Sequence, residues 1–155
     1  MSLITHMKRI IPNVALSTDI IVGFPTETDD EFNDTVQVCS QVEFDHAYIF
    51  KYSQRPNTRA ALKFVDDVPK RVKTERITQL VAMQKEWSRQ RNQRWVGLPQ
   101  SLLIERVDAV NGQVVGRNDA NVLTYVPHNA PNSITPGDWV TATPTRATPH
   151  GLTCV

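Results

Sequence analysis

The first 53 residues alternate between short apolar runs and a helical spacing of apolar positions. Residues 3–11 read as a helix that ends before Pro12, because proline lacks the backbone N–H that helical hydrogen bonds require. Residues 20–22 are three β-branched residues in succession, which predicts a strand buried on both faces, as in a parallel sheet. Gly23 and Pro25 then end this strand.

A second helix is expected directly after this turn. Thr28 and Glu31 have the spacing of a capping box, in which the side chain of each residue bonds to the backbone of the other. Apolar residues follow at helical intervals up to Val42, and residues 46–53 then read as a second strand. The order strand, helix, strand over residues 14–53 predicts two parallel strands joined by a right-handed crossover.

A long helix is expected from about Pro69 to Trp95, after an irregular stretch with a short helix at 59–64. At 1.5 Å per residue the long helix would extend roughly 40 Å, and Gly97 and Pro99 end it. One face of this helix would carry Ile77, Leu80, Val81, Gln84, Trp87, Arg91 and Trp95.

Beyond Pro99 the pattern changes to short strand candidates. Five such segments lie within residues 101–155, and Asn111-Gly112 is a strong signal for a hairpin. Short strands at this spacing predict a small antiparallel barrel. The chain therefore divides into three predicted regions, namely residues 1–68, 69–97 and 98–155.

The single strand-helix-strand unit is too small to be a stable parallel sheet. Such a sheet needs several strands, and helices must cover both of its faces. We therefore expect residues 1–68 to be the last part of a larger α/β domain.

Composition and charge narrow the class of protein. The chain is 40% hydrophobic and 21% charged, as in ordinary globular proteins. No apolar run predicts a membrane span, and the N-terminus lacks a secretory signal, so a cytoplasmic protein is expected. The net charge is −4 over residues 1–68, +6 over 69–97 and −1 over 98–155. The basic middle fits either a polyanionic partner or a solvated helix face.

Several motifs resemble one enzyme family along nearly the whole chain. "DIIVGFPTETDDEF" (19–32), "FDHAYIFKYSQRPNTRAA" (44–61) and "VPKRVKTERITQLVAMQ" (68–84) resemble the end of the barrel and the linking helix of radical S-adenosylmethionine methylthiotransferases. "VGRNDANVLTYV" (115–126) and "PGDWVTATPTRATPHGL" (136–152) resemble their C-terminal TRAM module, a small RNA-binding β-barrel. Within the family, the similarity is greatest to the members that convert isopentenyl-adenosine beside the tRNA anticodon to its 2-methylthio form.

The resemblance implies a fold, a reaction and cofactors. The fold would be a partial (β/α) radical-SAM barrel, a linking helix and a TRAM barrel that binds the tRNA anticodon stem-loop. The full-length parent would be a transferase that uses S-adenosylmethionine and two 4Fe-4S clusters. Two alternatives remain: a ribosomal-protein methylthiotransferase of the same superfamily, which the net −1 of residues 98–155 suits, and a stand-alone RNA-binding module.

The chain also departs from the family pattern. Thr26 and Asn57 stand where the family usually has glycine, and a β-branched residue such as Thr26 disfavours a positive φ. The closely spaced cysteines that hold the family's clusters are missing, and Cys39 and Cys154 do not replace them. The chain is thus expected to be a C-terminal fragment that is inactive by itself and holds no metal, and whose exposed sheet edges favour non-native self-association.

Candidate site residues follow from the resemblance, with no catalytic residue expected in this chain. The residues expected to border the S-adenosylmethionine are Asp19, Ile21, Gly23, Phe24, Glu27, Tyr52 and Arg55. Those expected to contact RNA are Arg89, Arg91, Arg94, Arg117, Asn118, Asn121 and Tyr125. For several of them a structural role remains an alternative, such as a turn at Gly23 or a salt bridge at Arg55. Phe50 and Trp139 are expected in the core.

Overall fold

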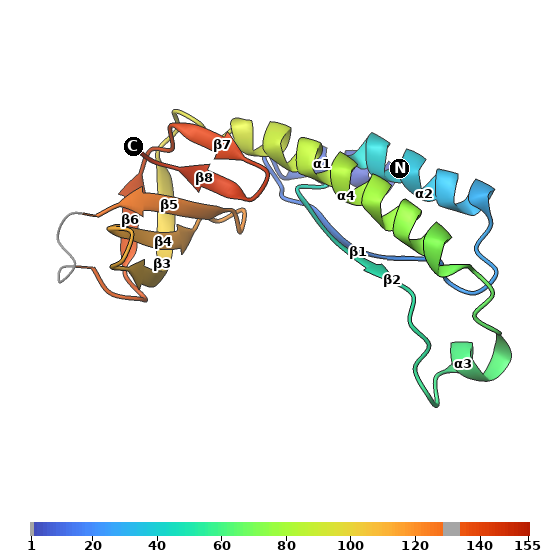
Figure 1. Cartoon of the computed structure of the whole chain (residues 1–155). Helices are drawn as coiled ribbons and strands as arrows, with labels where there is room; N and C mark the ends of the chain where they lie inside the picture. Colours follow the sequence, from blue (N-terminus) through green and yellow to red (C-terminus); the bar gives the residue numbers. More distant parts are fainter. Residues whose placement is uncertain (1, 129–133) are drawn as a thin grey trace. The chain divides into compact units, whose positions relative to one another are not determined.

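A computed structural model describes residues 2–128 and 134–155 as a mixed α/β protein (Figure 1). It divides into two compact units, which we describe separately. The first consists of Leu16–Gln84, and the second consists of Ser2–Ala15 together with Lys85–Val155. In the described part of the chain, no helix has both the length and the apolar character needed to cross a membrane.

The first unit contains the predicted strand-helix-strand motif. Strand β1 (Ser17–Val22) and strand β2 (His46–Lys51) are parallel, and helix α2 (Asp29–Val42) connects them. A short helix, α3 (Arg59–Lys63), follows β2. These elements confirm the order that the apolar pattern predicts, with bounds within a few residues.

The capping box at the start of α2 is confirmed. The Glu31 backbone N–H donates to Thr28 Oγ1 over 3.2 Å, and the Thr28 N–H donates to Glu31 Oε2 over 2.8 Å. The hydrogen bonds from the backbone and side chain of Thr28 lower the pKa of the Glu31 carboxyl below its usual value. The helix then buries Phe32, Cys39 and Val42.

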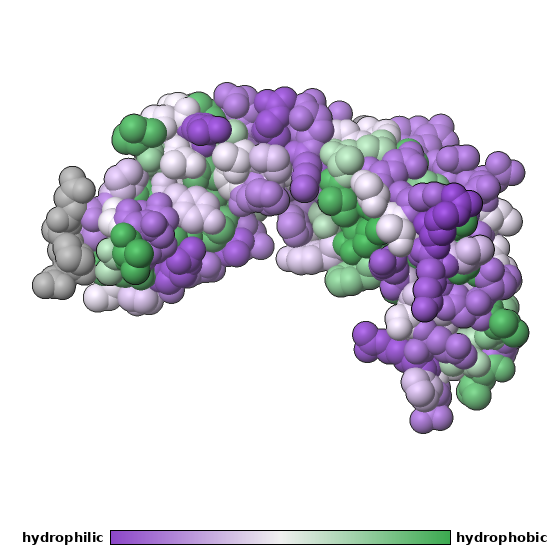
Figure 2. Space-filling model, viewed as in Figure 1, coloured by the Kyte–Doolittle hydropathy of each residue, from purple (hydrophilic) through white to green (hydrophobic). Residues whose placement is uncertain are grey.

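The strand pair β1–β2 is covered on one face only, which corrects the prediction of burial on both faces. Val22 is buried on the side of α2, whereas Ile21 and Phe50 on the other side are each 53% exposed. Phe50 is therefore not a core residue. Figure 2 shows apolar surface over this strand pair, among hydrophilic residues. In the described part of the first unit, α2 supplies a cover for one face and no second layer covers the other.

Helix α4 (Lys70–Gln93) is continuous and contributes to both units. Its most buried side chains recur every three to four residues, but all except one are polar: Lys73, Arg76, Leu80, Gln84, Ser88 and Asn92. Six of the seven residues of the predicted face are buried or half-buried, and only Val81 among them is exposed, at 37%. The buried stripe is polar because its side chains bind groups elsewhere in the chain. Gln84 Nε2 donates to Phe44 O over 2.8 Å, and Asn92 Nδ2 donates to Thr148 O over 2.9 Å.

The second unit contains helix α1 (Ser2–Ile10) and a six-stranded sheet in the order β6-β3-β4-β5-β8-β7. The strands are β3 (Gln100–Asp108), β4 (Gln113–Arg117), β5 (Leu123–Pro127), β6 (Trp139–Ala142), β7 (Arg146–Thr148) and β8 (Gly151–Thr153). The end of α1 before Pro12 is as predicted.

The six-stranded sheet does not form the predicted antiparallel barrel. No closed barrel forms among the described strands, β5 and β8 pair in parallel, and β6 and β7 are the edge strands. One of the five strand candidates, residues 138–148, forms two strands, because the chain breaks at Pro144, whose carbonyl accepts a hydrogen bond from Gly97 N–H. Proline has no backbone N–H to donate to a strand ladder.

Buried and exposed side chains alternate along β3, and the buried ones contribute to the core of the second unit. Leu102, Ile104 and Val114 are at most 1% exposed and form the centre of this core. Trp139, expected in the core, is instead 62% exposed, because it lies on the outer face at the start of edge strand β6.

Candidate functional site

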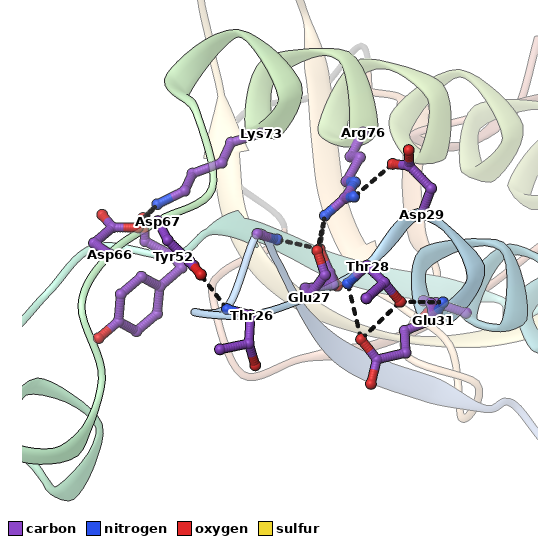
Figure 3. A network of polar contacts seen from close by, with 12 residues as sticks. Thr26, Glu27, Thr28, Asp29, Glu31, Tyr52, Asp66, Asp67, Lys73 and Arg76 are labelled. Carbon is purple, nitrogen blue, oxygen red and sulfur yellow. Dashed lines mark hydrogen bonds and ion pairs between the residues drawn. The ribbon is translucent and has the colours of Figure 1, made fainter.

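The turn at the carboxyl end of β1 is the candidate site (Figure 3). Parallel strands of α/β proteins place their ligands at this end of the sheet. Residues 23–29 form the turn, and the Glu27 N–H donates to Phe24 O over 2.9 Å. The Glu27 side chain folds back, so that its Oε2 accepts the Gly23 N–H over 2.5 Å. The turn is thus closed by its own carboxylate.

Arg76 of α4 binds this turn at three points. Its Nη1 donates to Glu27 Oε2 over 2.5 Å and to Glu27 O over 3.2 Å, and its Nη2 donates to Asp29 Oδ1 over 2.7 Å. The side chains of Arg76 and Glu27 are 6% and 13% exposed, so this ion pair is largely removed from water. Burial acts to lower the pKa of Arg76, but the hydrogen bonds and charges of Asp29 and Glu27 outweigh it and raise that pKa.

Lys73, one turn earlier on α4, reaches the ends of both strands. Its ammonium forms an ion pair with Asp66 and lies 5.2 Å from the centre of the Tyr52 ring. Nζ also donates to Tyr52 O over 3.5 Å. The Lys73 stem packs directly against Gly23, where any Cβ would collide with it. This close contact requires glycine at position 23.

Thr26 adopts the conformation that its β-branched side chain disfavours, with φ at 72°. Its N–H donates to Asp67 Oδ1 over 2.8 Å, which anchors the turn to the segment before α4. Asn57, the other departure from the family's glycines, also has a positive φ, of 64°. Both positions therefore keep a left-handed backbone without glycine. Beside Thr26 lies a cavity of about 290 Å³, which Asp67, Val68 and Arg76 also line.

The structure brings together only part of the set predicted to border the cofactor. Gly23 and Glu27 are hydrogen-bonded, and the Phe24 and Tyr52 rings meet edge to face with centres 5.2 Å apart. Asp19 and Ile21 lie on the exposed face of β1, and the Arg55 side chain is exposed in the loop after β2. The Glu27 carboxylate is directed at Gly23 and Arg76 (Figure 3).

Most of the residues predicted to contact RNA have partners within the chain. Arg89 pairs with Glu86 over 2.6 Å, and Arg117 pairs with Glu105 over 3.0 Å. The Arg94 guanidinium lies 4.7 Å from the centre of the Trp95 ring. Half-buried positions in the second unit are held by Arg91 on α4 and Tyr125 on β5.

Asn118 is 7% exposed and organises the turn before β5. Its Oδ1 accepts the N–H groups of Ala120 and Val122, and its Nδ2 donates to Gln100 Oε1 over 3.0 Å. Asn121, which is exposed, has φ at 60° in the same turn. Asn118 thus shapes the turn, whereas Asn121 presents its side chain to solvent.

The outer face of the sheet carries a further exposed row. Leu103 pairs in register with Trp139 on one side and with Arg117 on the other. Directly opposite residues in antiparallel strands have neighbouring side chains on the same face. An exposed indole, an aliphatic side chain and a guanidinium therefore lie next to one another across β6, β3 and β4.

Sequence reasoning missed the roles of Lys73 and Arg76, which it treated as part of a basic helix surface. A local signal existed, because both residues fall on the buried stripe that Leu80 and Gln84 continue. Their partners, however, are distant along the chain: Glu27 lies 49 residues before Arg76. No pattern within the helix identifies such a partner.

Exposed residues on β1 and in the segments after β1 and β2 fit the adenosine-containing cofactor that the resemblance implies. Phe24 is 41% exposed and offers an aromatic surface, and the exposed Asp19 and Arg55 offer a carboxylate and a guanidinium. Such a combination of apolar surface and a few polar groups is typical of small-molecule sites.

The two cysteines of the chain are not arranged to bind an iron-sulfur cluster. Cys39 and Cys154 are buried in different units, and burial raises the pKa of both thiols, which disfavours the thiolate that iron requires. Within residues 2–128 and 134–155, no three His, Cys, Asp or Glu side chains form a group that could bind a metal. Cys39 and Cys154 therefore do not form a ligand set for one cluster.

No protein-family profile matches the chain. Individual proteins do match it. It is 40% identical over 149 residues to tRNA-2-methylthio-N(6)-dimethylallyladenosine synthase of Thermus thermophilus. This alignment covers 96% of the chain and 31% of the relative. Proteins of the same name from Nocardia farcinica and Deinococcus radiodurans are 38% and 45% identical, covering 98% and 80% of the chain. The alignments span 31% and 24% of those two relatives.

The similarity extends over both units, and the chain spans about a third of the length of the curated relatives that it matches. The chain therefore belongs, as a segment of that length, to the methylthiotransferase family whose members are named tRNA-2-methylthio-N(6)-dimethylallyladenosine synthase.

Proposed function

We propose that this chain is the C-terminal part of a cytoplasmic tRNA methylthiotransferase that modifies isopentenyl-adenosine beside the anticodon. The observation that carries the proposal is the similarity, over 96% of the chain, to proteins named for this reaction. The exposed face of β1–β2 supports it, because a parallel strand pair with one bare face is what a part of a larger barrel presents.

In this proposal the first unit forms part of the wall of the S-adenosylmethionine site. Ile21 and Phe24 contribute apolar surface beside the adenosine, and Asp19 and Arg55 contribute polar contacts. When bound, S-adenosylmethionine would supply both groups: one molecule, cleaved by one-electron reduction, would give the radical that abstracts hydrogen, and a second molecule would give the methyl group. The two 4Fe-4S clusters belong to the rest of the enzyme, since the cysteines of this chain do not fit them.

The second unit, which we assign as a TRAM module, would hold the tRNA anticodon stem-loop. The row of Trp139, Leu103 and Arg117 has the chemistry of a stacking platform for unpaired bases. Basic residues on the solvent side of α4, such as Lys85 and Arg89, would add phosphate contacts. Lys73 and Arg76 have no such role, because both are buried.

The alternatives carry less support. The relatives are named for a tRNA substrate, which does not favour the ribosomal-protein methylthiotransferase. A stand-alone RNA-binding module would leave the apolar face of Ile21 and Phe50 in water without a function.

The proposal is tested on the longest reading frame that encodes this chain. The protein is purified with its clusters reconstituted and is incubated with S-adenosylmethionine, reductant and tRNA that carries isopentenyl-adenosine. Mass spectrometry of the digested nucleosides should show the 2-methylthio derivative, and the 155-residue chain alone should not produce it. Modification of a ribosomal protein with unchanged tRNA, or full activity of the 155-residue chain, would contradict the proposal.

A further inference from the structure

We propose that Arg76 is a positioning residue for the S-adenosylmethionine site, acting through Glu27 on the backbone at Gly23. This inference rests on the proposed function. It moves Glu27 from the group of residues that touch the cofactor to the group that shapes the turn beside it, and it assigns a role to a helix residue outside the barrel motif.

The Glu27 carboxylate accepts two hydrogen bonds at one oxygen. Its Oε2 accepts both the Gly23 N–H and an Nη1–H of Arg76, each over 2.5 Å. The side chain is only 13% exposed. A carboxylate oxygen that accepts from two donors acts as a bridge between them, so the position of Gly23 depends on the position of Arg76.

The charges of Glu27 and Arg76 balance each other. Glu27 and Arg76 are both withdrawn from water, and Arg76 Nη2 also binds Asp29 at the start of α2. Removal of one partner from a buried ion pair leaves the other charge uncompensated, which is far more costly than losing a surface pair. The guanidinium also lies 5.2 Å from the centre of the Phe32 ring, which places it over the first turn of α2. The pair therefore connects α4, the turn and α2.

The turn has an unfavourable backbone conformation. Gly23 and Thr26 both have positive φ, of 69° and 72°, and Thr26 adopts this value against its own preference. Such a conformation persists only when its surroundings hold it. Here the Lys73 stem packs under Gly23, and Asp67 accepts the Thr26 N–H. Residues 66–76 thus hold a turn that lies some 40–50 residues earlier in the chain.

Loss of Arg76 should affect the binding of S-adenosylmethionine and not the binding of RNA. Loss of the Arg76 fork should let the Gly23 backbone move, and displacements on the order of 1 Å at a positioned group weaken binding or catalysis by up to roughly a hundredfold. Affinity for S-adenosylmethionine should therefore fall, whereas RNA affinity should not, because none of the proposed RNA contacts is part of this network.

The test compares Arg76→Met, Arg76→Lys and the control Arg71→Met in the full-length, cluster-reconstituted protein. Arg71 lies on the same helix and pairs with Glu75, but its side chain is 80% exposed. Equilibrium dialysis should show at least a tenfold loss of S-adenosylmethionine affinity for Arg76→Met, a smaller loss for Arg76→Lys, and none for Arg71→Met. Binding of a stem-loop RNA should stay within twofold throughout. Wild-type affinity for S-adenosylmethionine in a folded Arg76→Met protein would overturn the inference.

A second measurement on the 155-residue chain needs no cofactor. Amide hydrogen exchange resolved by NMR should be faster at Gly23 in Arg76→Lys, because the carboxylate that protects this N–H is no longer held in place. Exchange at Thr26 should be unchanged, because Asp67 accepts that N–H. Unchanged exchange at Gly23 would overturn the inference. If the wild-type full-length protein fails to bind S-adenosylmethionine, the proposed function fails instead, and the exchange result still decides the structural role of Arg76.

Discussion

Two residues in the turn after β1 show how a single position can carry a conformational requirement. At Gly23 the positive φ and the packed Lys73 stem act together, so that both the backbone and the available space exclude a side chain. Thr26 meets only the first of these conditions and is tolerated there, because its side chain is exposed and its N–H has a partner.

Gly23→Ala is expected to destabilise the chain by more than the backbone cost alone. The positive φ costs roughly 1–2 kcal/mol for an L-residue, and the collision with Lys73 adds to it. Gly112→Ala is the matched control: its φ is also positive, at 61°, but a Cβ there meets nothing within 4 Å. Urea unfolding should therefore give a larger loss of unfolding free energy for Gly23→Ala. Equal losses of unfolding free energy in the two variants would show that the Lys73 side chain moves away from the new Cβ at no energetic cost.

Elements differ in how well local sequence describes them. Helix α2 is defined by its capping box and its apolar spacing, both of which lie within 14 residues. Helix α4 has a boundary that local signals also mark, yet its buried stripe is polar. A polar stripe is stable only with matched partners, which for Arg76, Gln84 and Asn92 come from three separate segments.

The exposed ion pair between Arg89 and Glu86 on α4 predicts a dependence of stability on pH. Hydrogen bonds from Arg89 and Gln90 lower the pKa of Glu86 from 4.5 to about 2. Because the folded pKa lies below the unfolded one, the stabilising contribution is complete above pH 4.5 and is lost as the pH falls toward 2.

NMR titration of the Glu86 carboxyl should accordingly give a midpoint near 2. In Arg89→Gln the midpoint should move up toward the usual value, because the largest contribution is the Arg89 hydrogen bond. A wild-type midpoint near 4.5 would mean that this surface pair is not formed in solution.

At the scale of the whole molecule, two exposed surfaces remain after the fold has formed. One is the bare face of β1–β2, with Ile21 and Phe50, which the proposed function assigns to the barrel interior. The other is the row of Trp139, Leu103 and Arg117 on the second unit. Neither is needed for the core of its own unit, which is why each is available for a partner.

Trp139→Ala is expected to weaken binding of anticodon stem-loop RNA to the 155-residue chain by about tenfold. Stacking of a base on an aromatic side chain contributes roughly 1–3 kcal/mol. Trp139→Phe keeps an aromatic face and should retain most of the affinity. Fluorescence anisotropy with labelled RNA measures both variants, and addition of RNA should quench the Trp139 emission. Equal affinity of Trp139→Ala and wild type would remove this residue from the RNA surface.

Helix and strand positions, the capping box and the family were predictable from the sequence because their signals lie close together along the chain. Capping needs two residues three positions apart, and the β-branched run marks β1 by itself. The wrong expectations, namely burial of Phe50 and Trp139 and a closed barrel, all depended on which distant segment packs where.

The sequence by itself determined the order of the elements, the capping of α2 and the family, since propensity, capping and motif spacing are local properties. Only the tertiary structure decided that Arg76 and Lys73 belong to the strand-end turn and not to a basic surface. The physical reason is that a buried charge is stable only beside its partner, and the position of that partner is set by the packing of whole elements.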